Sequence, residues 1–519
     1  MKLLKLLAAF IVLFCCGGVL LAQDSTETSN SSSLESKLPQ GLTLMNQLKY
    51  STDYKEKIDI FEDWLNMDYR TGMFSAGLRL VSFQPKDPTV SGTKRRNSEV
   101  DFKYFKVETG DADEGAEIVA GNYYAMFGRG LILKSYEDRN IRIDNNLLGV
   151  KVTGRYSGFT LTALSGMPEN LDGDRKDVIY AADLEYSGFA PLKAGFTFAA
   201  NKPDQDGAAE TRLTSFRIQP KIWNFDFYGE YGVKQNDDDK LKYFNNSESI
   251  VGKGAYGSVN FYYDSFSILG EYKYYDNFLF ASSDNSVTYN TPPATRKDYS
   301  YILLNRHPSP LNQDNEQGFQ VEVNYTINEG IFLSANYGLT KTLSGESYYQ
   351  RIHLTDVAER TQLKESFVQG TFTWNKSFTT IAGFAYNEEL ATNTKNLTPV
   401  LETRYYFGDV NTLRLVLEHQ QTTVFSTQEK YYTDVATFEY LRSPKFSASL
   451  VGEIDTKENT PGNIDRKYFG FIQFGYNFFD NTDVTLLFGS RQAGAICIGG
   501  VCRYEPKFDG VEFKMLTRI

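Results

Sequence analysis

The chain has 519 residues, and 54 Lys and Arg against 65 Asp and Glu give a formal net charge of −11. This balance excludes a general nucleic-acid-binding protein, because such proteins need a basic face. With 35 Tyr and 38 Phe the chain is not disordered. Charged residues nevertheless make up 23% of it, too many for these rings to fill a conventional core. The combination indicates β-strands with one wet face and one apolar face.

The N-terminus has the pattern of an export signal. Two lysines precede an apolar stretch over residues 6–14, and Ala22 then leads into a polar segment. This order predicts a secretory signal peptide over 1–22, cleaved after Ala22, and a flexible lead-in over 23–40. The alternative is a lipoprotein signal ending at Cys15, but a bulky phenylalanine precedes that cysteine where a small residue is needed.

From about residue 41 onward, apolar and polar residues alternate in segments of roughly 10–13 residues, the length of a tilted strand that crosses a bilayer. No later segment has the ~18–20 uncharged apolar residues of a membrane helix. One clear example alternates Phe319, Val321 and Val323 with Gln320, Glu322 and Asn324.

Connections between these segments alternate between short and long, which is typical of an outer-membrane barrel with periplasmic turns and external loops. We therefore predict an all-β fold: a single large antiparallel transmembrane β-barrel over 41–519, with about 24 strands (22–26) and both termini on the periplasmic side. The polar, proline-containing segment 278–315 is predicted to be an external, mobile loop. The alternative is a large soluble sandwich or propeller, which the long strands and the lack of blade-like repeats disfavour.

Few residues suggest an enzyme. His307, His353 and His419 have no Ser or Asp partner at a useful position in the sequence, so we expect no catalytic activity. The G-x-G-x-x-G match at 252–257 enters a strand, with no helix to direct at a phosphate. Acidic clusters such as 237–239 lack the spacing of an EF-hand and are expected to be solvated. We expect neither a cofactor nor a metal.

Cys497 and Cys502 are the cysteines outside the signal region. Their spacing around Gly499 and Gly500 suits a disulfide that closes a hairpin. A metal site would need further Cys or His nearby, and the sequence has none there.

Charged residues in the inward phase of the strands are the candidate lumen wall. They fit a water-filled channel, and they fit equally well a set of salt bridges that holds the wall round. The wall candidates are Arg79, Glu230, Glu271, Glu322, Arg404 and Arg414.

The segment 121–150 is too apolar for a free loop and too charged for lipid, so we expect part of it to fold into the lumen. There Arg129, Lys134, Arg139 and Arg142 would form a positive constriction, and such charges set channel selectivity. The alternatives are an extra pair of strands or a structural plug.

The run from Gly121 to Val150 and the stretch from Cys497 to Pro506 resemble an uncharacterised outer-membrane family, a domain of unknown function found in Bacteroidota-type bacteria. The first stretch is also similar to porins in which an arginine-bearing segment precedes an Asp…Gly-Val strand start. The resemblance implies a barrel in the cell outer membrane and carries no established substrate or active residues.

These observations predict a porin-like passive channel for small solutes with an anion preference. The alternative is a closed barrel that serves as a structural or interaction scaffold in a surface or secretion complex. Expected partners are outer-membrane lipid and small solutes, not nucleic acid; the sequence names no protein partner.

Overall fold

The computed structural model describes residues 39–519 apart from ten internal gaps, and the predicted signal peptide and nearly all of the lead-in lie outside the described residues. The gaps are 84–97, 171–172, 205–209, 237–249, 307–309, 346, 354–358, 458–466, 479–480 and 499–500.

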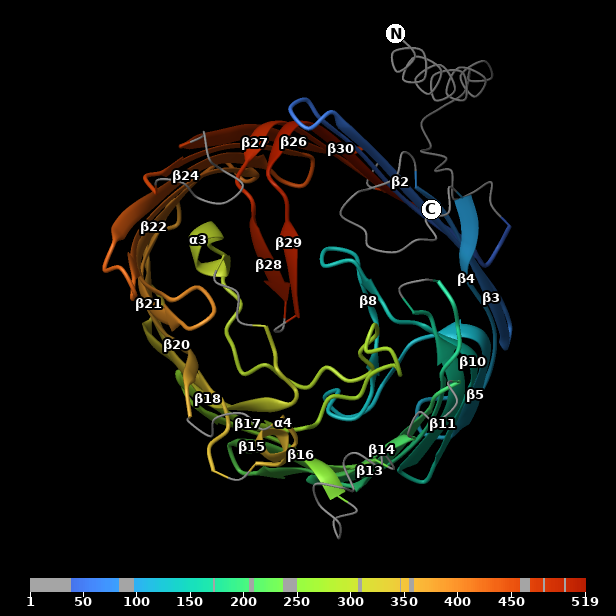
Figure 1. Cartoon of the computed structure of the whole chain (residues 1–519). Helices are drawn as coiled ribbons and strands as arrows, with labels where there is room; N and C mark the ends of the chain where they lie inside the picture. Colours follow the sequence, from blue (N-terminus) through green and yellow to red (C-terminus); the bar gives the residue numbers. More distant parts are fainter. Residues whose placement is uncertain are drawn as a thin grey trace, which may run out of the picture.

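The described residues form one closed sheet of 24 antiparallel strands (Figure 1), which confirms the predicted fold class and strand number. The first half of the wall is β1 (Leu42–Asp53), β2 (Ile58–Thr71), β3 (Phe74–Phe83), β4 (Ser98–Gly110), β5 (Gly115–Tyr123), β10 (Leu147–Tyr156), β11 (Phe159–Pro168), β12 (Val178–Phe189), β13 (Leu192–Lys202), β14 (Thr211–Ile222), β15 (Phe225–Asn236) and β16 (Ile250–Tyr263). The second half is β17 (Phe266–Asp276), β18 (Asn315–Asn328), β19 (Ile331–Lys341), β20 (Thr361–Asn375), β21 (Phe378–Glu389), β22 (Thr394–Phe407), β23 (Asn411–Val424), β24 (Lys430–Arg442), β25 (Phe446–Asp455), β26 (Tyr468–Phe478), β27 (Thr482–Arg491) and β30 (Phe508–Arg518).

The barrel closes where its first strand pairs with its last. Each strand otherwise pairs with its neighbours along the chain, and β1 pairs with β30 so that Lys49 lies opposite Lys514. Closure removes the sheet edges, whose backbone groups would otherwise lack hydrogen-bond partners in lipid. No helix in the described part of the chain is long and apolar enough to cross a membrane.

The two ends of the barrel differ. At one end, which we call the short-turn end, strands are joined by turns such as residues 223–224 between β14 and β15. At the other, the long-loop end, connections are mostly longer, although residues 390–393 form a short one. The outward faces carry large exposed apolar side chains, and Trp223 at the short-turn end is 94% exposed.

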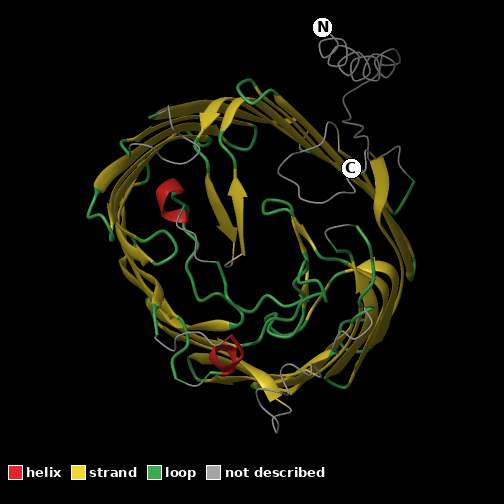
Figure 2. Ribbon diagram, viewed as in Figure 1, coloured by secondary structure: helices red, strands yellow, loops and turns green. Residues whose placement is uncertain are grey.

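Of the described connections, three fold into the lumen from the long-loop end, as Figures 1 and 2 show. The lumen insert, residues 124–146, contains β6 (Ala125–Met126), β7 (Lys134–Ser135), β8 (Glu137–Asp138) and β9 (Ile143–Asp144). The lumen loop, residues 277–314, contains α3 (Ile302–Asn305). The lumen hairpin consists of β28 (Gly494–Ile498) and β29 (Val501–Glu505), and α4 (Tyr348–His353) lies between β19 and β20.

The lumen loop corrects the prediction of an external, mobile segment over 278–315. Its residues Phe278, Phe280 and Tyr289 are buried in one cluster with the lumen insert and the inward faces of the wall from β5 to β17. Burying such rings stabilises the segment, whereas exposing them to water would not. Residues 307–309 of this segment lie outside the described residues.

The glycine motif at 252–257 belongs to this packing. A Cβ on Gly254 would lie 2.5 Å from the Phe278 ring, and one on Gly252 would lie 2.2 Å from the Asn277 carbonyl oxygen. These glycines in β16 therefore give the lumen loop room to approach the wall, which is a structural role and not a phosphate site.

Candidate lumen site

Backbone and amide hydrogen bonds join the lumen insert to the lumen loop. The Lys134 N–H donates to the Tyr289 carbonyl (2.8 Å), and the Thr291 N–H donates to the Gly130 carbonyl (3.1 Å). The Asn290 side chain donates to the Leu131 carbonyl (3.1 Å). These bonds satisfy polar groups that would otherwise be costly to bury beside the fully buried side chains of residues 131–133. The two segments therefore form one packed unit.

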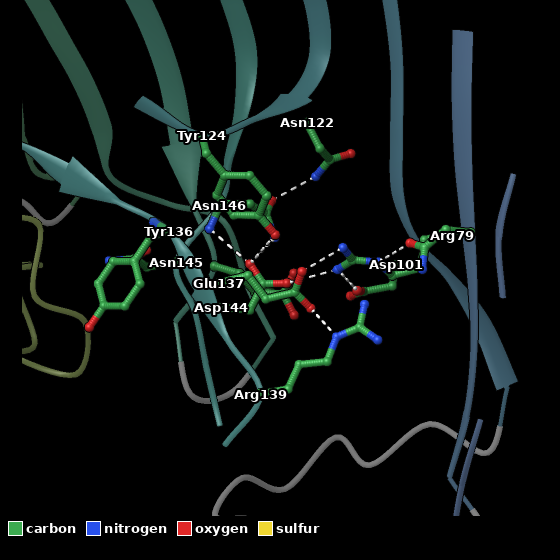
Figure 3. Close-up of polar contacts among 12 residues, drawn as sticks. Arg79, Asp101, Asn122, Tyr124, Tyr136, Glu137, Arg139, Asp144, Asn145 and Asn146 are labelled. Carbon is green, nitrogen blue, oxygen red and sulfur yellow. Dashed lines mark hydrogen bonds and ion pairs between the residues drawn. The ribbon is translucent and has the colours of Figure 1, made fainter. Parts of the chain in front are cut away.

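Arg79 on β3 is the centre of a polar network where the insert meets the wall (Figure 3). Its guanidinium donates to Glu137 (2.8 Å) and Asp144 (3.2 Å) of the insert, and to Asp101 (3.3 Å) of β4. It also donates from Nε to Asn66 on β2 (2.8 Å). A buried arginine needs this many acceptors, because leaving its N–H groups unmet in a dry site is costly.

Two arginines of the insert reach the strands near the closure. Arg139 donates to Gln47 on β1 (2.7 Å) and to Glu137 (2.6 Å), and its guanidinium lies 5.0 Å from the Trp64 ring centroid. Arg142 forms an ion pair with Glu62 on β2 (3.1 Å). Two of the four predicted constriction residues, Arg139 and Arg142, therefore fasten the insert to β1 and β2.

Arg129 lies over two aromatic rings of the wall, Tyr228 on β15 and Tyr256 on β16. Its guanidinium is 4.5 Å from the Tyr228 ring centroid, and it donates to the Tyr256 hydroxyl (2.9 Å). The Tyr228 hydroxyl donates to Glu230 (2.5 Å), and the Tyr256 hydroxyl donates to Glu271. Both carboxylates are predicted wall acids. The arrangement is a cation–π site whose carboxylates lie one hydrogen bond away.

Lys134 is half-buried with its ammonium 4.5 Å from the Tyr136 ring centroid. Burial lowers the pKa of the Lys134 ammonium, and burial also raises the pKa of the Tyr136 phenol. Both shifts follow from the cost of removing a charge from water. All four predicted insert cations are thus placed, and the three arginines have acceptor or ring partners.

Arg217 on β14 is a buried centre that the sequence reasoning did not select as a site residue. It donates through both terminal nitrogens to Asp183 (2.6 and 2.8 Å) and also to Glu185 (2.9 Å). Its side chain is 2% exposed. Its inward phase predicts a lumen position, but nothing in the sequence marks it as the buried one among many inward charges.

The lumen loop is attached to the second half of the wall by charge. Glu418 on β23 accepts from the backbone N–H groups of Ile302 (3.0 Å) and Leu303 (2.7 Å), where α3 begins. Arg306 forms an ion pair with Glu453 on β25. Sequence reasoning did not predict these contacts, because the loop was expected outside. The predicted wall acid Glu322 is likewise paired with Lys297 of this loop (2.6 Å).

Around the closure the charges are arranged differently. Glu512 on β30 is 6% exposed, whereas Lys514 beside it is 50% exposed and Arg491 on β27 is 37% exposed. The Lys514 ammonium lies 2.8 Å from Oε1 of Glu512. The Lys49 ammonium and the Arg491 guanidinium lie 3.6 and 3.7 Å from Oε2 of the same carboxylate. We call Lys49, Arg491, Lys514 and Glu512 the seam cluster.

The predicted wall residues Arg404 and Arg414 form a second charged group on β22 and β23. Both approach the buried Glu402 carboxylate, at 2.6 and 2.8 Å, and Arg414 also contacts Glu439 on β24 (2.8 Å). Two arginines and two carboxylates make this group neutral.

In the lumen hairpin the backbone register places Cys497 directly opposite Cys502. This spacing is compatible with the predicted disulfide, which stays a prediction.

His419 corrects the expectation that the histidines have no acidic partner. Its Nδ1 lies 2.6 Å from Asp434 on the neighbouring strand, and its ring stacks on Tyr432. Both members of the pair are about half exposed and share the outward face with Leu417, so they do not line the lumen.

Among the described residues no group of three or more His, Cys, Asp and Glu is placed to hold a metal ion. What the lumen side chains can do chemically is to bind and orient charge. The fold and these side chains together define a class: a closed 24-stranded antiparallel barrel, in its described residues, whose lumen holds packed inserts and a charged wall. The chain belongs to the family of unknown function DUF6029, whose model matches residues 1–519.

No curated protein matches the sequence. Among solved structures, the chain is similar to the FrpB iron transporter of Neisseria meningitidis in its apoprotein form, with 9% identity and a TM-score of 0.39 over 93% of this chain and 82% of that one. It is also similar to a chain of an E. coli P pilus tip assembly intermediate, with 9% identity and a TM-score of 0.48 over 96% and 63% of the two chains. It is similar as well to the outer membrane protein OpdK of Pseudomonas aeruginosa, with 11% identity and a TM-score of 0.34 over 77% of this chain and 96% of that one. None of these similarities bears on function.

Proposed function

We propose that this protein is an outer-membrane barrel that acts as a porin-like passive channel for small solutes. The observation that carries the proposal is the hydration of the seam cluster. Lys514 and Arg491 share the inward face with the buried Glu512, yet they are 50% and 37% exposed. Inward charges that remain hydrated are expected beside a water-filled lumen and not beside a solid plug.

The outward face supports a membrane location. Large apolar side chains are exposed there around most of the wall, and Trp223, Trp374 and Tyr263 lie at the short-turn end. Aromatic girdles of this kind lie at membrane interfaces. We accordingly place the short-turn end in the periplasm and the long-loop end outside a Gram-negative cell of the Bacteroidota type, after export on the signal peptide predicted over 1–22.

Orientation is tested with single cysteines at the two ends in the C497S/C502S background. Lys57→Cys lies between β1 and β2 at the long-loop end, and Trp223→Cys lies at the short-turn end. A membrane-impermeant maleimide added to intact cells should label the first and spare the second. Labelling of Trp223→Cys alone would reverse the orientation.

Conduction is tested with the purified barrel in planar bilayers. Stable open currents that scale with salt concentration support the channel. A folded barrel, recognised by its heat-modifiable gel mobility, that stays electrically silent would exclude it.

The predicted anion preference of the insert remains part of this proposal. Replacing Arg129, Arg139 and Arg142 with Gln removes three positive charges from the lumen insert, and reversal potentials in a salt gradient then measure ion preference. A shift towards cations supports the insert as a selectivity element. An unchanged preference would mean that these arginines serve only the contacts that fasten the insert.

A closed scaffold is the second candidate function, and the large buried cluster favours it. Phe278, Phe280 and residues 131–133 are fully buried between the insert, the loop and the wall, as in a plug. A silent barrel would leave this candidate, with the long-loop end as its interaction face.

A further inference from the structure

The seam cluster combines residues from both ends of the chain. Lys49 comes from the first strand, Lys514 from the last, and Arg491 from the strand before it. Their side chains share the inward face. Lys49 lies opposite Lys514, and Lys514 lies opposite Thr485 on β27. Arg491 is an even number of residues from Thr485 on the same strand, so its side chain points the same way. Barrel closure therefore brings three cations to one place in the lumen.

One carboxylate organises these cations without neutralising them. The Lys49 ammonium and the Arg491 guanidinium lie 3.6 and 3.7 Å from Glu512 Oε2, beyond hydrogen-bond distance from that oxygen. The Lys514 ammonium is 2.8 Å from Oε1. Glu512 lies beneath them and is 6% exposed, so the lumen solvent meets the cations and not the acid.

The neighbouring acids are engaged elsewhere. Glu62, opposite Lys49 on β2, is paired with Arg142 of the lumen insert. Asp53 accepts the backbone N–H groups of Lys55 and Asp509. The seam cluster itself carries three positive charges and one negative charge. Arg491 is further supported by the Phe508 ring, whose centroid lies 5.0 Å from its guanidinium.

We propose that the seam cluster is a binding subsite for small oxyanions, either phosphate or a dicarboxylate, on the solute path. The inference deepens the proposed channel, because it rests on a solvent-filled lumen and assigns the solute to a chemical class. Arginine and lysine donors around a single point suit a phosphate or carboxylate oxygen set. The buried Glu512 keeps the site from binding its anion too tightly to release it, as conduction requires.

The test uses the full-length barrel in detergent and needs no conduction. An amine-reactive acylating reagent modifies Lys514, and mass spectrometry measures its rate with inorganic phosphate, succinate or sodium chloride at equal ionic strength, which separates binding from screening. We expect phosphate or succinate to slow acylation of Lys514 by about threefold or more, the factor reached when about two thirds of the sites are occupied and only the free sites react. Lys221, exposed at the short-turn end, reports non-specific effects.

Two variants locate the effect. Lys49→Gln with Arg491→Gln should abolish the protection of Lys514. Arg404→Gln with Arg414→Gln removes as much charge from the neutral group on β22 and β23 and should leave the protection in place. Absence of protection by either oxyanion, equal protection at Lys221, or loss of protection in both variants would overturn the subsite.

The two proposals fail separately. A silent barrel in which Lys514 is protected would refute the channel and keep the subsite. A conducting barrel in which neither oxyanion protects Lys514 would keep the channel and refute the subsite. The stronger of the two oxyanion arms identifies which chemistry the site prefers.

Discussion

The packed side of the lumen, from β5 to β17, and the seam around β27, β30 and β1 use the same charged residues to opposite ends. Arg217 on the packed side is buried, as is Arg79 on β3 where the lumen insert meets the wall. Their guanidinium groups donate to two and three carboxylates respectively. At the seam one buried carboxylate lies beneath three cations, of which Lys514 is half exposed. The inward phase of a charged residue therefore gives only its position in the barrel, while its partners and its exposure decide whether it holds the wall together or faces the lumen.

The largest effect should come from the packed cluster. Phe278→Ala removes a fully buried ring that fills the space left by Gly254, and such truncations cost about 3–5 kcal/mol of unfolding free energy. Urea unfolding measures the cost. Met45→Ala is the matched control, an inward, exposed side chain near the seam, for which less than about 1 kcal/mol is expected. Equal costs for the two variants would show that the packed side is no more a core than the seam.

Breaking the buried ion pair should follow. Asp183→Asn leaves Arg217 without the carboxylate that accepts from both of its terminal nitrogens, and removing one partner of a buried pair costs about 3–5 kcal/mol. Glu185 compensates in part, so we expect the lower end of that range. The control is Asp226→Asn, which breaks the exposed pair with Lys221 and should cost less than about 1 kcal/mol. A small loss in both variants would contradict the distinction between buried and hydrated charge.

The lumen hairpin should give a smaller effect. A disulfide between Cys497 and Cys502 would close a short loop, which stabilises by roughly 2 kcal/mol in the chain-entropy model. Peptide mapping under non-reducing conditions should recover the two cysteines in one cross-linked species, and the C497S/C502S variant should lose about that stability. Two free thiols in protein isolated without reductant would refute the bond.

The smallest effect is expected on the outer surface. His419→Ala removes a half-exposed partner of Asp434 that does not face the lumen, so conductance and ion preference should stay within error and stability should change by less than about 1 kcal/mol. Altered ion preference in this variant would mean that charges on the outward face influence ion passage. Ion preference could then not be attributed to the charges inside the lumen.

The wall was predictable because its pattern is regular. Alternation with a period of two predicts strands, and the lengths of the connections predict their number, which the 24 strands of the described chain confirm. The inward phase of Arg404 and Arg414 also follows from this period. The same period cannot say which inward charge is buried, since burial depends on the segments that cover it.

The lumen loop was not predictable from its composition. Pro292, Pro293 and a Ser- and Asn-rich tract are typical of an exposed loop, and its rings at Phe278, Phe280 and Tyr289 follow no helical or strand period. Their burial depends on glycines of β16 and on the lumen insert, which are distant in sequence. The seam cluster was hidden for a related reason, because it exists only through the pairing of the two ends of the chain.

That pairing has a consequence for biogenesis. Lys49 is among the first wall residues to emerge from the ribosome, and Lys514 is among the last. An intermediate whose first and last strands have not yet paired, or a product clipped before β30, lacks the complete cluster while retaining most of its hydrogen-bonded wall. The complete cluster is thus present only in the closed barrel. A ligand that binds there would stabilise the closed barrel relative to its open precursors.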